Sequence, residues 1–263
     1  MVHGYEDACQ SLQRLGGLRV LEDTSLAEPE VGRRGGMAWI GDNSLEFGEP
    51  FGPQSPVTGF LNRFGPGMHS LGVQVTNLDA TLAHLLTLKV DVVARSEEFA
   101  FVFCDPRDTE GLLLQFASTE MPFDPRFGGA VPELAITPLL DVSALAYVGA
   151  TVPDPGGSAT RLAEVIGTAV TFSAGGVTAG VDLGDCTLGL TKGGKGERSR
   201  WTHLGLLVPD LQAAETLLHD DGWEPRLQIG LDGRGELAIA PERTGMIPVT
   251  LVDALLPGDP RLG

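Results

Sequence analysis

A short pattern recurs three times in this 263-residue sequence: an apolar run ends at an Asn or Asp, and a helical pattern follows. In the two most similar copies, Gly72 aligns with Gly205 and Asn77 aligns with Asp210. The third copy, residues 147–154, has the same register and continues into an Asp-Pro-Gly-Gly turn. An Asn or Asp directly after an apolar run is typical of a strand followed by the N-cap of a helix. Repetition of this kind indicates that the chain is built from copies of one supersecondary module.

Each copy is followed by an amphipathic helical pattern, and a fourth pattern of the same kind lies near the N-terminus. Apolar residues recur in all four at the spacing of one helix face. Gly16-Gly17 and Gly222 follow two of these patterns, and glycine is favoured where a helix ends. The apolar positions are Ala8, Leu12 and Leu15; Leu78, Leu82, Leu85 and Leu86; Leu162, Val165 and Ile166; and Leu211, Ala214, Leu217 and Leu218.

A short apolar strand closes each module, after a stretch of strand-like alternation. The four closing runs are residues 43–47, 112–116, 186–190 and 247–251. The distance from the opening to the closing strand is nearly constant, with 45 residues from Ser70 to Gln115, 42 from Tyr147 to Gly189 and 47 from His203 to Thr250. The sequence therefore predicts an α+β fold made of four βαβββ modules.

The Pro- and Gly-rich run 118–132 separates the first two modules from the last two. We predict a first domain over residues 1–117, a linker over 118–132, a second domain over 133–256 and a tail over 257–263. Two domains of this size agree with the length of the chain.

Composition limits the partners of the protein. There are 18 Lys and Arg residues against 35 Asp and Glu residues, which gives a formal net charge of −17. A field of this sign repels nucleic acid and anionic membranes, so we expect neither as a partner. The sequence begins without an apolar signal-like run, and its three cysteines are too few for a disulfide framework. These features predict a cytoplasmic protein whose partner is a small molecule.

The sequence around the second module resembles the vicinal oxygen chelate superfamily. The resemblance lies in the run 65–73, the turn 105–111 and the closing strand 114–116, and in the strand region 37–50 of the first module. This superfamily includes glyoxalase I, methylmalonyl-CoA epimerase, extradiol dioxygenases and the bleomycin- and fosfomycin-resistance proteins. The sequence is most similar to the glyoxalase- and epimerase-like members. The resemblance implies two tandem domains with cup-shaped mixed sheets, in which the first and last strand of each module supply metal ligands.

In the first domain the implied ligand positions are only partly filled. Glu46 and Gln115 stand at the last-strand positions, and Ser70 rather than a histidine stands at the first-strand position of the second module. His69, its neighbour, is expected to point to the other face. The first-strand position of the first module falls upstream of Met1, so that strand is truncated. Two explanations are open: the true start lies further upstream, or a neighbouring element covers the missing edge.

In the second domain the implied positions are Tyr147, Gly189, His203 and Thr250, with Val249 as an alternative to Thr250. Only His203 is a natural metal ligand. An extradiol dioxygenase needs two histidines and one carboxylate around iron, so this activity is the least favoured of those considered. The sequence indicates no certain cofactor, and it leaves open whether a divalent Mg, Mn, Zn or Fe ion is bound.

We therefore expect a glyoxalase- or epimerase-like protein that acts on a small carbonyl compound in the cup of the first domain. Glu46 is the candidate general base and, with Gln115, a candidate member of an incomplete metal site. The alternative is a structural role for both residues. Glu46 can be a charged residue at the sheet edge, and Gln115 can be a buried amide that hydrogen-bonds to the backbone. The candidate substrate contacts are Gln115, Ser70, His69, Tyr147 and His203.

Two further interpretations stay open. The same cup can bind a drug or metabolite without catalysis, as in the resistance proteins of the superfamily. The second domain can also serve only to pack against the first or to form a homodimer.

Overall fold

The computed structural model describes residues 1–2, 4–23, 32–41, 43–52, 55–97, 100–118 and 136–262. The predicted linker, residues 118–132, lies outside these ranges except for Ser118. No helix among the described residues is long and apolar enough to cross a membrane.

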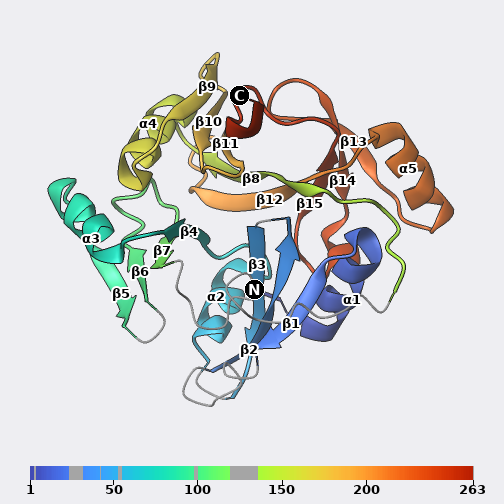
Figure 1. Ribbon diagram of the computed structural model, residues 1–263, viewed down its shortest axis with the longest axis horizontal. Helices are drawn as coiled ribbons and strands as arrows, with labels where there is room; N and C mark the ends of the chain where they lie inside the picture. Colours follow the sequence, from blue (N-terminus) through green and yellow to red (C-terminus); the bar gives the residue numbers. More distant parts are fainter. Residues whose placement is uncertain are drawn as a thin grey trace. The chain divides into compact units, whose positions relative to one another are not determined.

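The predicted repeat is present as secondary structure (Figure 1). The second module consists of β4 (Leu71–Val75), α3 (Leu78–Thr87), β5 (Val92–Ser96), β6 (Phe101–Cys104) and β7 (Leu114–Ser118). The third consists of β8 (Ala144–Val152), α4 (Pro155–Ile166), β9 (Val170–Ala174), β10 (Thr178–Asp182) and β11 (Thr187–Lys192). The fourth consists of β12 (Arg200–Leu207), α5 (Leu211–Asp220), β13 (Arg226–Ile229), β14 (Gly235–Ile239) and β15 (Val249–Val252).

The first module has the helix and three strands but differs at its start. It contains α1 (Tyr5–Gly16), β1 (Arg19–Asp23), β2 (Arg33–Ile40) and β3 (Asn43–Pro50), and the three strands form an antiparallel sheet in the order β1-β2-β3. The backbone N–H of Val2 donates to the carbonyl oxygen of Gly48 on β3 at 3.0 Å. Val2 therefore lies at the place along β3 where the sequence alignment puts the end of a first strand.

Asn77 and Asp210 cap helices as predicted, whereas the side chain of Asp154 makes no capping hydrogen bond and the predicted Asp-Pro-Gly-Gly turn is the first turn of α4. The side chain of Asn77 accepts a hydrogen bond from the N–H of Ala80, and that of Asp210 accepts one from Ala213, both at 2.9 Å. Gly17 ends α1 with a φ of 67°, a left-handed conformation that glycine adopts without strain. One helix was not predicted: α2 (Pro56–Phe64), which begins with a proline in its first turn.

Strand register confirms that the opening and closing strands of a module are neighbours. β4 pairs with β7 in parallel, with Gly72 opposite Gln115, and β12 pairs with β15 in parallel, with Gly205 opposite Thr250. The two middle strands of each module extend the sheet in antiparallel fashion, as β6 and β5 do beyond β7 and as β14 and β13 do beyond β15. Equivalent residues of the two modules thus occupy equivalent places in the sheet.

Contacts within the chain divide it into two compact units. Unit 1 comprises residues 1–68, 131–148 and 202–256, and unit 2 comprises residues 69–130, 149–201 and 257–263. Unit 1 contains the β1-β2-β3 sheet and strands in the order β13-β14-β15-β12-β8; unit 2 contains the β4-β7-β6-β5 sheet and strands in the order β8-β11-β10-β9. Strands β8 and β12 contribute residues to both units. The linear domain boundaries at residues 117 and 133 stay a prediction.

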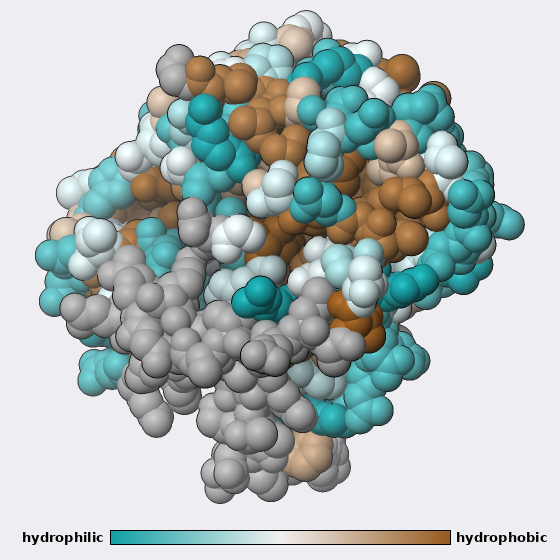
Figure 2. Space-filling model, turned by 45° about the vertical axis from the view of Figure 1, so that its right-hand side comes forward, coloured by the Kyte–Doolittle hydropathy of each residue, from teal (hydrophilic) through white to brown (hydrophobic). Residues whose placement is uncertain are grey.

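Apolar side chains from helices and strands form the interior of each unit. Leu12, Leu15, Leu206 and Leu251 are among the fully buried residues of unit 1, and Leu85, Phe116, Leu162 and Leu188 are among those of unit 2. Other large apolar residues stay exposed, such as Ile229 at 75%. Figure 2 shows hydrophobic surface between hydrophilic residues on the face that it draws.

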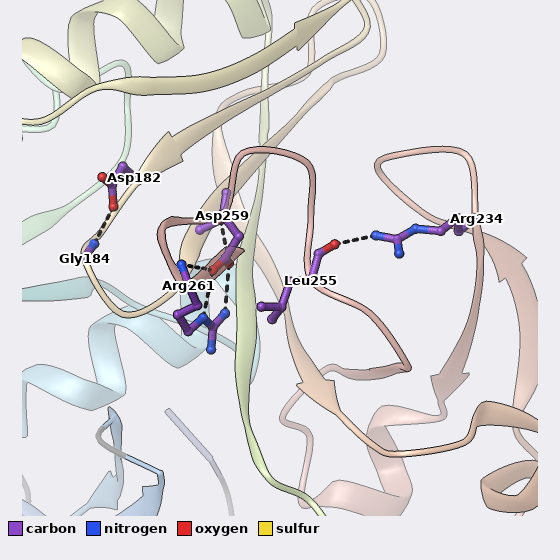
Figure 3. A network of polar contacts seen from close by, with 7 residues as sticks. Asp182, Gly184, Arg234, Leu255, Asp259 and Arg261 are labelled. Atoms are coloured by element: carbon purple, nitrogen blue, oxygen red, sulfur yellow. Dashed lines mark hydrogen bonds and ion pairs between the residues drawn. The ribbon is translucent and has the colours of Figure 1, made fainter. Parts of the chain in front are cut away.

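The last residues of the chain, predicted as a tail, carry an ordered polar contact in unit 2. The buried carboxylate of Asp259 accepts hydrogen bonds from the Arg261 guanidinium at 2.8 and 2.9 Å (Figure 3) and from the Thr187 hydroxyl of β11 at 3.0 Å. The neighbouring guanidinium and the hydrogen bonds hold the pKa of the Asp259 carboxyl below its usual range against the opposing effect of burial. This contact anchors the C-terminal segment to its own unit.

Candidate functional site

Four strands of unit 1 bring polar side chains together around one hydroxyl group, that of Tyr147 on β8. His203 Nε2 on β12 lies 2.9 Å from the hydroxyl oxygen, Glu236 Oε2 on β14 lies 2.7 Å from it, and Thr250 Oγ1 on β15 lies 3.1 Å from it. Tyr147 is fully buried, and Glu236 and Thr250 are 4% exposed, whereas His203 is half-buried. We refer to Tyr147, His203, Glu236 and Thr250 as the tyrosine cluster.

The register of β12 and β15 creates the space for the tyrosine ring. Gly205 lies opposite Thr250, and the ring of Tyr147 occupies the volume beside it. A β-carbon at residue 205 would lie 2.3 Å from the nearest ring carbon, a distance that two carbon atoms do not tolerate. His203 stands two residues before Gly205 and therefore points to the same face of the strand.

Glu236 is a buried carboxylate that is satisfied by neutral donors. The Tyr147 hydroxyl donates to Oε2, and the Gln228 side-chain amide donates to Oε1, both at 2.7 Å. Gln228 lies directly opposite Glu236 in the antiparallel pairing of β13 and β14. Within the described part of the chain, Glu236 forms no ion pair. Both carboxylate oxygens thus receive the hydrogen bonds that burial of a polar group requires.

The hydrogen-bond directions in the cluster follow from the number of available protons. The Tyr147 hydroxyl has one proton, which it donates to Glu236, so its oxygen accepts from the Nε2–H of His203. The other ring nitrogen, Nδ1, lies 2.9 Å from the Thr202 hydroxyl and accepts from it. Donors therefore run in one direction, from Thr202 through His203 and Tyr147 to Glu236.

Burial controls the protonation of the cluster. It lowers the pKa of His203 below its usual value, and the negative charge of Glu236 offsets this effect only in part. Burial, together with the nearby Glu236 charge, raises the pKa of Tyr147 far above its usual value. At neutral pH, His203 is therefore uncharged and Tyr147 keeps its proton.

The sequence predicted Tyr147, His203 and Thr250 as positions of the second cup, and the structure brings all three together. Gly189, the fourth position, is opposite Gly180 in unit 2. The sequence interpretation missed Glu236 and Gln228. A signal for Glu236 was present, because it is the one charged residue in the run 236–240 (Glu-Leu-Ala-Ile-Ala), and a charged residue that is buried with such a strand needs partners.

Glu46, the predicted base, lies on β3 of unit 1. It is exposed, and its carboxylate forms an ion pair with the Arg33 guanidinium at 2.6 Å, where the Arg33 side chain is 28% and the Glu46 side chain 39% exposed. This exposed, ion-paired environment is the one expected for a charged residue at a sheet edge, the alternative role that the sequence left open for Glu46. The catalytic assignment of Glu46 stays a prediction.

The remaining predicted site residues belong to unit 2. Gln115 is half-buried on β7 opposite Gly72. His69 and Ser70 precede β4, and His69 Nδ1 lies 3.2 Å from the Ser70 hydroxyl. The His69 ring also meets the edge of Phe103, with ring centroids 6.5 Å apart. Gln115 and Glu46 lie in different compact units, and their joint role as metal ligands stays a prediction.

The donor set of the described residues does not fit a metal ion. Within the described ranges, no three His, Cys, Asp or Glu side chains gather in a group that could hold one. The tyrosine cluster offers two such side chains, His203 and Glu236, and both are engaged by Tyr147. A stable divalent site normally takes at least three protein ligands.

Comparisons with known proteins support the fold. No family model matches the chain. In solved structures, 99% of the chain superposes on 93% of a mutant 4-hydroxymandelate synthase from Streptomyces coelicolor, with a TM-score of 0.69 and 14% identity. It also superposes, over 98% of its length, on 81% of a Mn(II)-bound glyoxalase from Novosphingobium aromaticivorans, with a TM-score of 0.62 and 12% identity. The chain therefore has the vicinal oxygen chelate fold, and the α+β architecture of βαβββ modules is confirmed.

Among curated proteins, the chain is 28% identical over 117 residues to human mitochondrial methylmalonyl-CoA epimerase, a similarity that covers 42% of the chain. The matched part spans 65% of the length of that protein. The predicted resemblance to glyoxalase- and epimerase-like members of the superfamily is confirmed by these relatives.

Proposed function

We propose that this protein is a glyoxalase- or epimerase-like enzyme that moves a proton on the carbon next to the carbonyl group of a small molecule, with His203 as its acid–base group. The observation that supports this most is the tyrosine cluster, in which a half-buried histidine is linked through Tyr147 to the buried carboxylate of Glu236. Histidine is the commonest general acid–base group, and a second group that orients it is the usual arrangement. The relative named methylmalonyl-CoA epimerase suggests a thioester as a first substrate class to test.

The proposed step uses only groups of this chain. The Thr202 hydroxyl first turns away from Nδ1 of His203, which frees the lone pair of that nitrogen. The C–H bond next to the carbonyl then breaks, its proton goes to Nδ1, and the electron pair of the C–H bond moves to the carbonyl oxygen. The imidazolium so formed is stabilised by the Glu236 charge across the Tyr147 hydroxyl. The lowered pKa of His203 keeps Nδ1 without a proton before the step and favours the return of the proton afterwards.

A second candidate site is the one predicted from the sequence, with Glu46 as base and Gln115 orienting the substrate in the first cup. Substitutions separate the two sites. The chain is incubated with methylmalonyl-CoA in heavy water, and deuterium incorporation is followed by mass spectrometry. Loss of exchange in His203→Gln with retention in Glu46→Gln supports the tyrosine cluster. The reverse pattern supports the first cup.

A second candidate function is small-molecule binding without catalysis. It is favoured by the absence, within the described ranges, of a side-chain group that could hold a metal ion. Saturable binding of a carbonyl compound without any exchange, and unchanged by EDTA, would replace the enzyme proposal by this one. A cytoplasmic location and a homodimer stay proposals that rest on the sequence.

A further inference from the structure

We propose that the last two modules carry a cup that binds no metal ion. In it the Tyr147 hydroxyl on β8 of the third module joins the opening and closing strands of the fourth module, β12 and β15, at positions where the resemblance implies metal ligands. The inference goes beyond the proposed function, because it stands whether or not the cluster turns over a substrate. It rests on how the side chains meet. Strands β12, β14 and β15 each send one polar side chain to the hydroxyl oxygen of Tyr147 on β8, at distances of 2.7–3.1 Å.

The negative charge of the cluster is stabilised by hydrogen bonds rather than by a cation. Glu236 supplies one negative charge at most, and each of its oxygens already accepts a hydrogen bond, from Tyr147 or from Gln228. His203 Nε2 is bound to the same tyrosine, and Nδ1 is bound to Thr202. A metal ion would have to break these hydrogen bonds and would then find only two side chains of the usual ligand types.

The backbone is adapted to the ring. Residue 205 has room for glycine alone, because Tyr147 fills the space where a β-carbon would lie. At the equivalent Gly72 of the second module, a β-carbon would meet nothing closer than the Gln115 oxygen at 3.8 Å, which is an ordinary contact. Of these two equivalent glycines, only Gly205, against which the Tyr147 ring packs, is required by its surroundings, as expected if the ring is an integral part of the cup.

The first test is metal analysis of the purified protein, prepared without chelators. Under the proposal, the wild-type protein holds far less than one equivalent of Mg, Mn, Fe or Zn, and Tyr147→Phe has the same content as the wild type but a Tm lower by several degrees. One equivalent of metal in the wild type that is lost in His203→Ala overturns the proposal.

The second test builds a metal site on the same frame. The double variant Tyr147→His with Thr250→Glu adds two ligands beside His203 and removes the hydroxyl that occupies the cluster. Titration with Co²⁺ is expected to give visible absorption bands in the double variant and none in the wild type. The same double variant with His203→Ala is the matched control and is expected to lose the bands. Circular dichroism verifies folding.

A folded double variant that binds no Co²⁺ shows that residues 147, 203 and 250 do not form a common ligand frame, and this overturns the geometric part of the proposal. If the double variant fails to fold, the proposal is judged by the metal content of the wild type and of His203→Ala alone. Both tests measure metal binding and neither measures enzymatic activity. Their results can therefore be interpreted even if the proposed function is wrong.

Discussion

The ring of Tyr147 lies against Gly205, in the space that any side chain at residue 205 would need. Gly205 is also opposite Thr250, whose hydroxyl meets the Tyr147 hydroxyl at 3.1 Å. A single close approach between β8 and β12 thus positions the aromatic ring and the polar groups at its tip. Because the tyrosine is fully buried, the fit at Gly205 bears on stability and on the candidate site together.

Gly205→Ala is expected to destabilise the protein. The added methyl group overlaps the buried ring, and overpacking of this kind costs about 1–3 kcal/mol of the free energy of unfolding. The matched control is Gly72→Ala, where the new β-carbon finds only an ordinary contact with Gln115 and the change should stay within about 0.5 kcal/mol. Urea unfolding of both variants measures the difference. Equal destabilisation by the two substitutions would show that the ring does not occupy this space.

Tyr147→Phe keeps the ring and removes the hydroxyl. Glu236 then loses one of its two hydrogen bonds while it stays buried, and we expect a loss of about 1–3 kcal/mol in the free energy of unfolding. A double-mutant cycle with Glu236→Gln isolates the contact between the two residues, with a coupling energy of about 0.5–3 kcal/mol. Additive effects of the two substitutions would contradict the proposed contact.

Alkaline pH is expected to destabilise the wild-type protein through Tyr147. Its pKa is raised in the folded state, so the unfolded chain loses the tyrosine proton first, near pH 10. The stabilisation due to this group is complete below pH 10 and decreases as the pH rises above it. Tyr147→Phe lacks this component, so its free energy of unfolding should fall less steeply above pH 10. Equal slopes for the two proteins would argue that Tyr147 ionises normally in the fold.

Acidic pH acts through His203 with the opposite sign. Its pKa is lowered in the folded state, so the unfolded chain takes up a proton first as the pH falls below about 6.5. The stabilisation is complete above that value and decreases toward lower pH. His203→Gln should flatten the dependence between pH 7 and pH 5. NMR titration of the His203 ring gives the pKa directly.

Glu46→Gln is expected to leave the fold almost unchanged. The ion pair with Arg33 is partly exposed to solvent, and such pairs contribute at most about 1 kcal/mol. Thermal unfolding of this variant should therefore resemble that of the wild type. A large loss of exchange activity without a loss of stability would then point to Glu46 as a base, and a large loss of stability would show a structural role that the contacts do not predict.

The modular architecture could be predicted from local sequence patterns. Helix periodicity, Asx caps at Asn77 and Asp210 and the constant spacing between opening and closing strands are local patterns, and each depends on residues close together in the chain. Helix α2 was not predicted because it belongs to no repeat and has a proline in its first turn. The same alignment also placed Tyr147, His203 and Thr250 at related positions of their strands.

The surroundings of these side chains could not be predicted from the sequence, because they depend on contacts between distant segments. The sequence selected Glu46 for chemistry because a carboxylate stood at an expected ligand position, yet its solvent exposure and its Arg33 partner follow from how β2 and β3 pair. Glu236 was overlooked because its partners, Tyr147 and Gln228, lie 89 and 8 residues away in the sequence. Burial and hydrogen bonding depend on which strands meet in space, and that information is absent from any one segment of the chain.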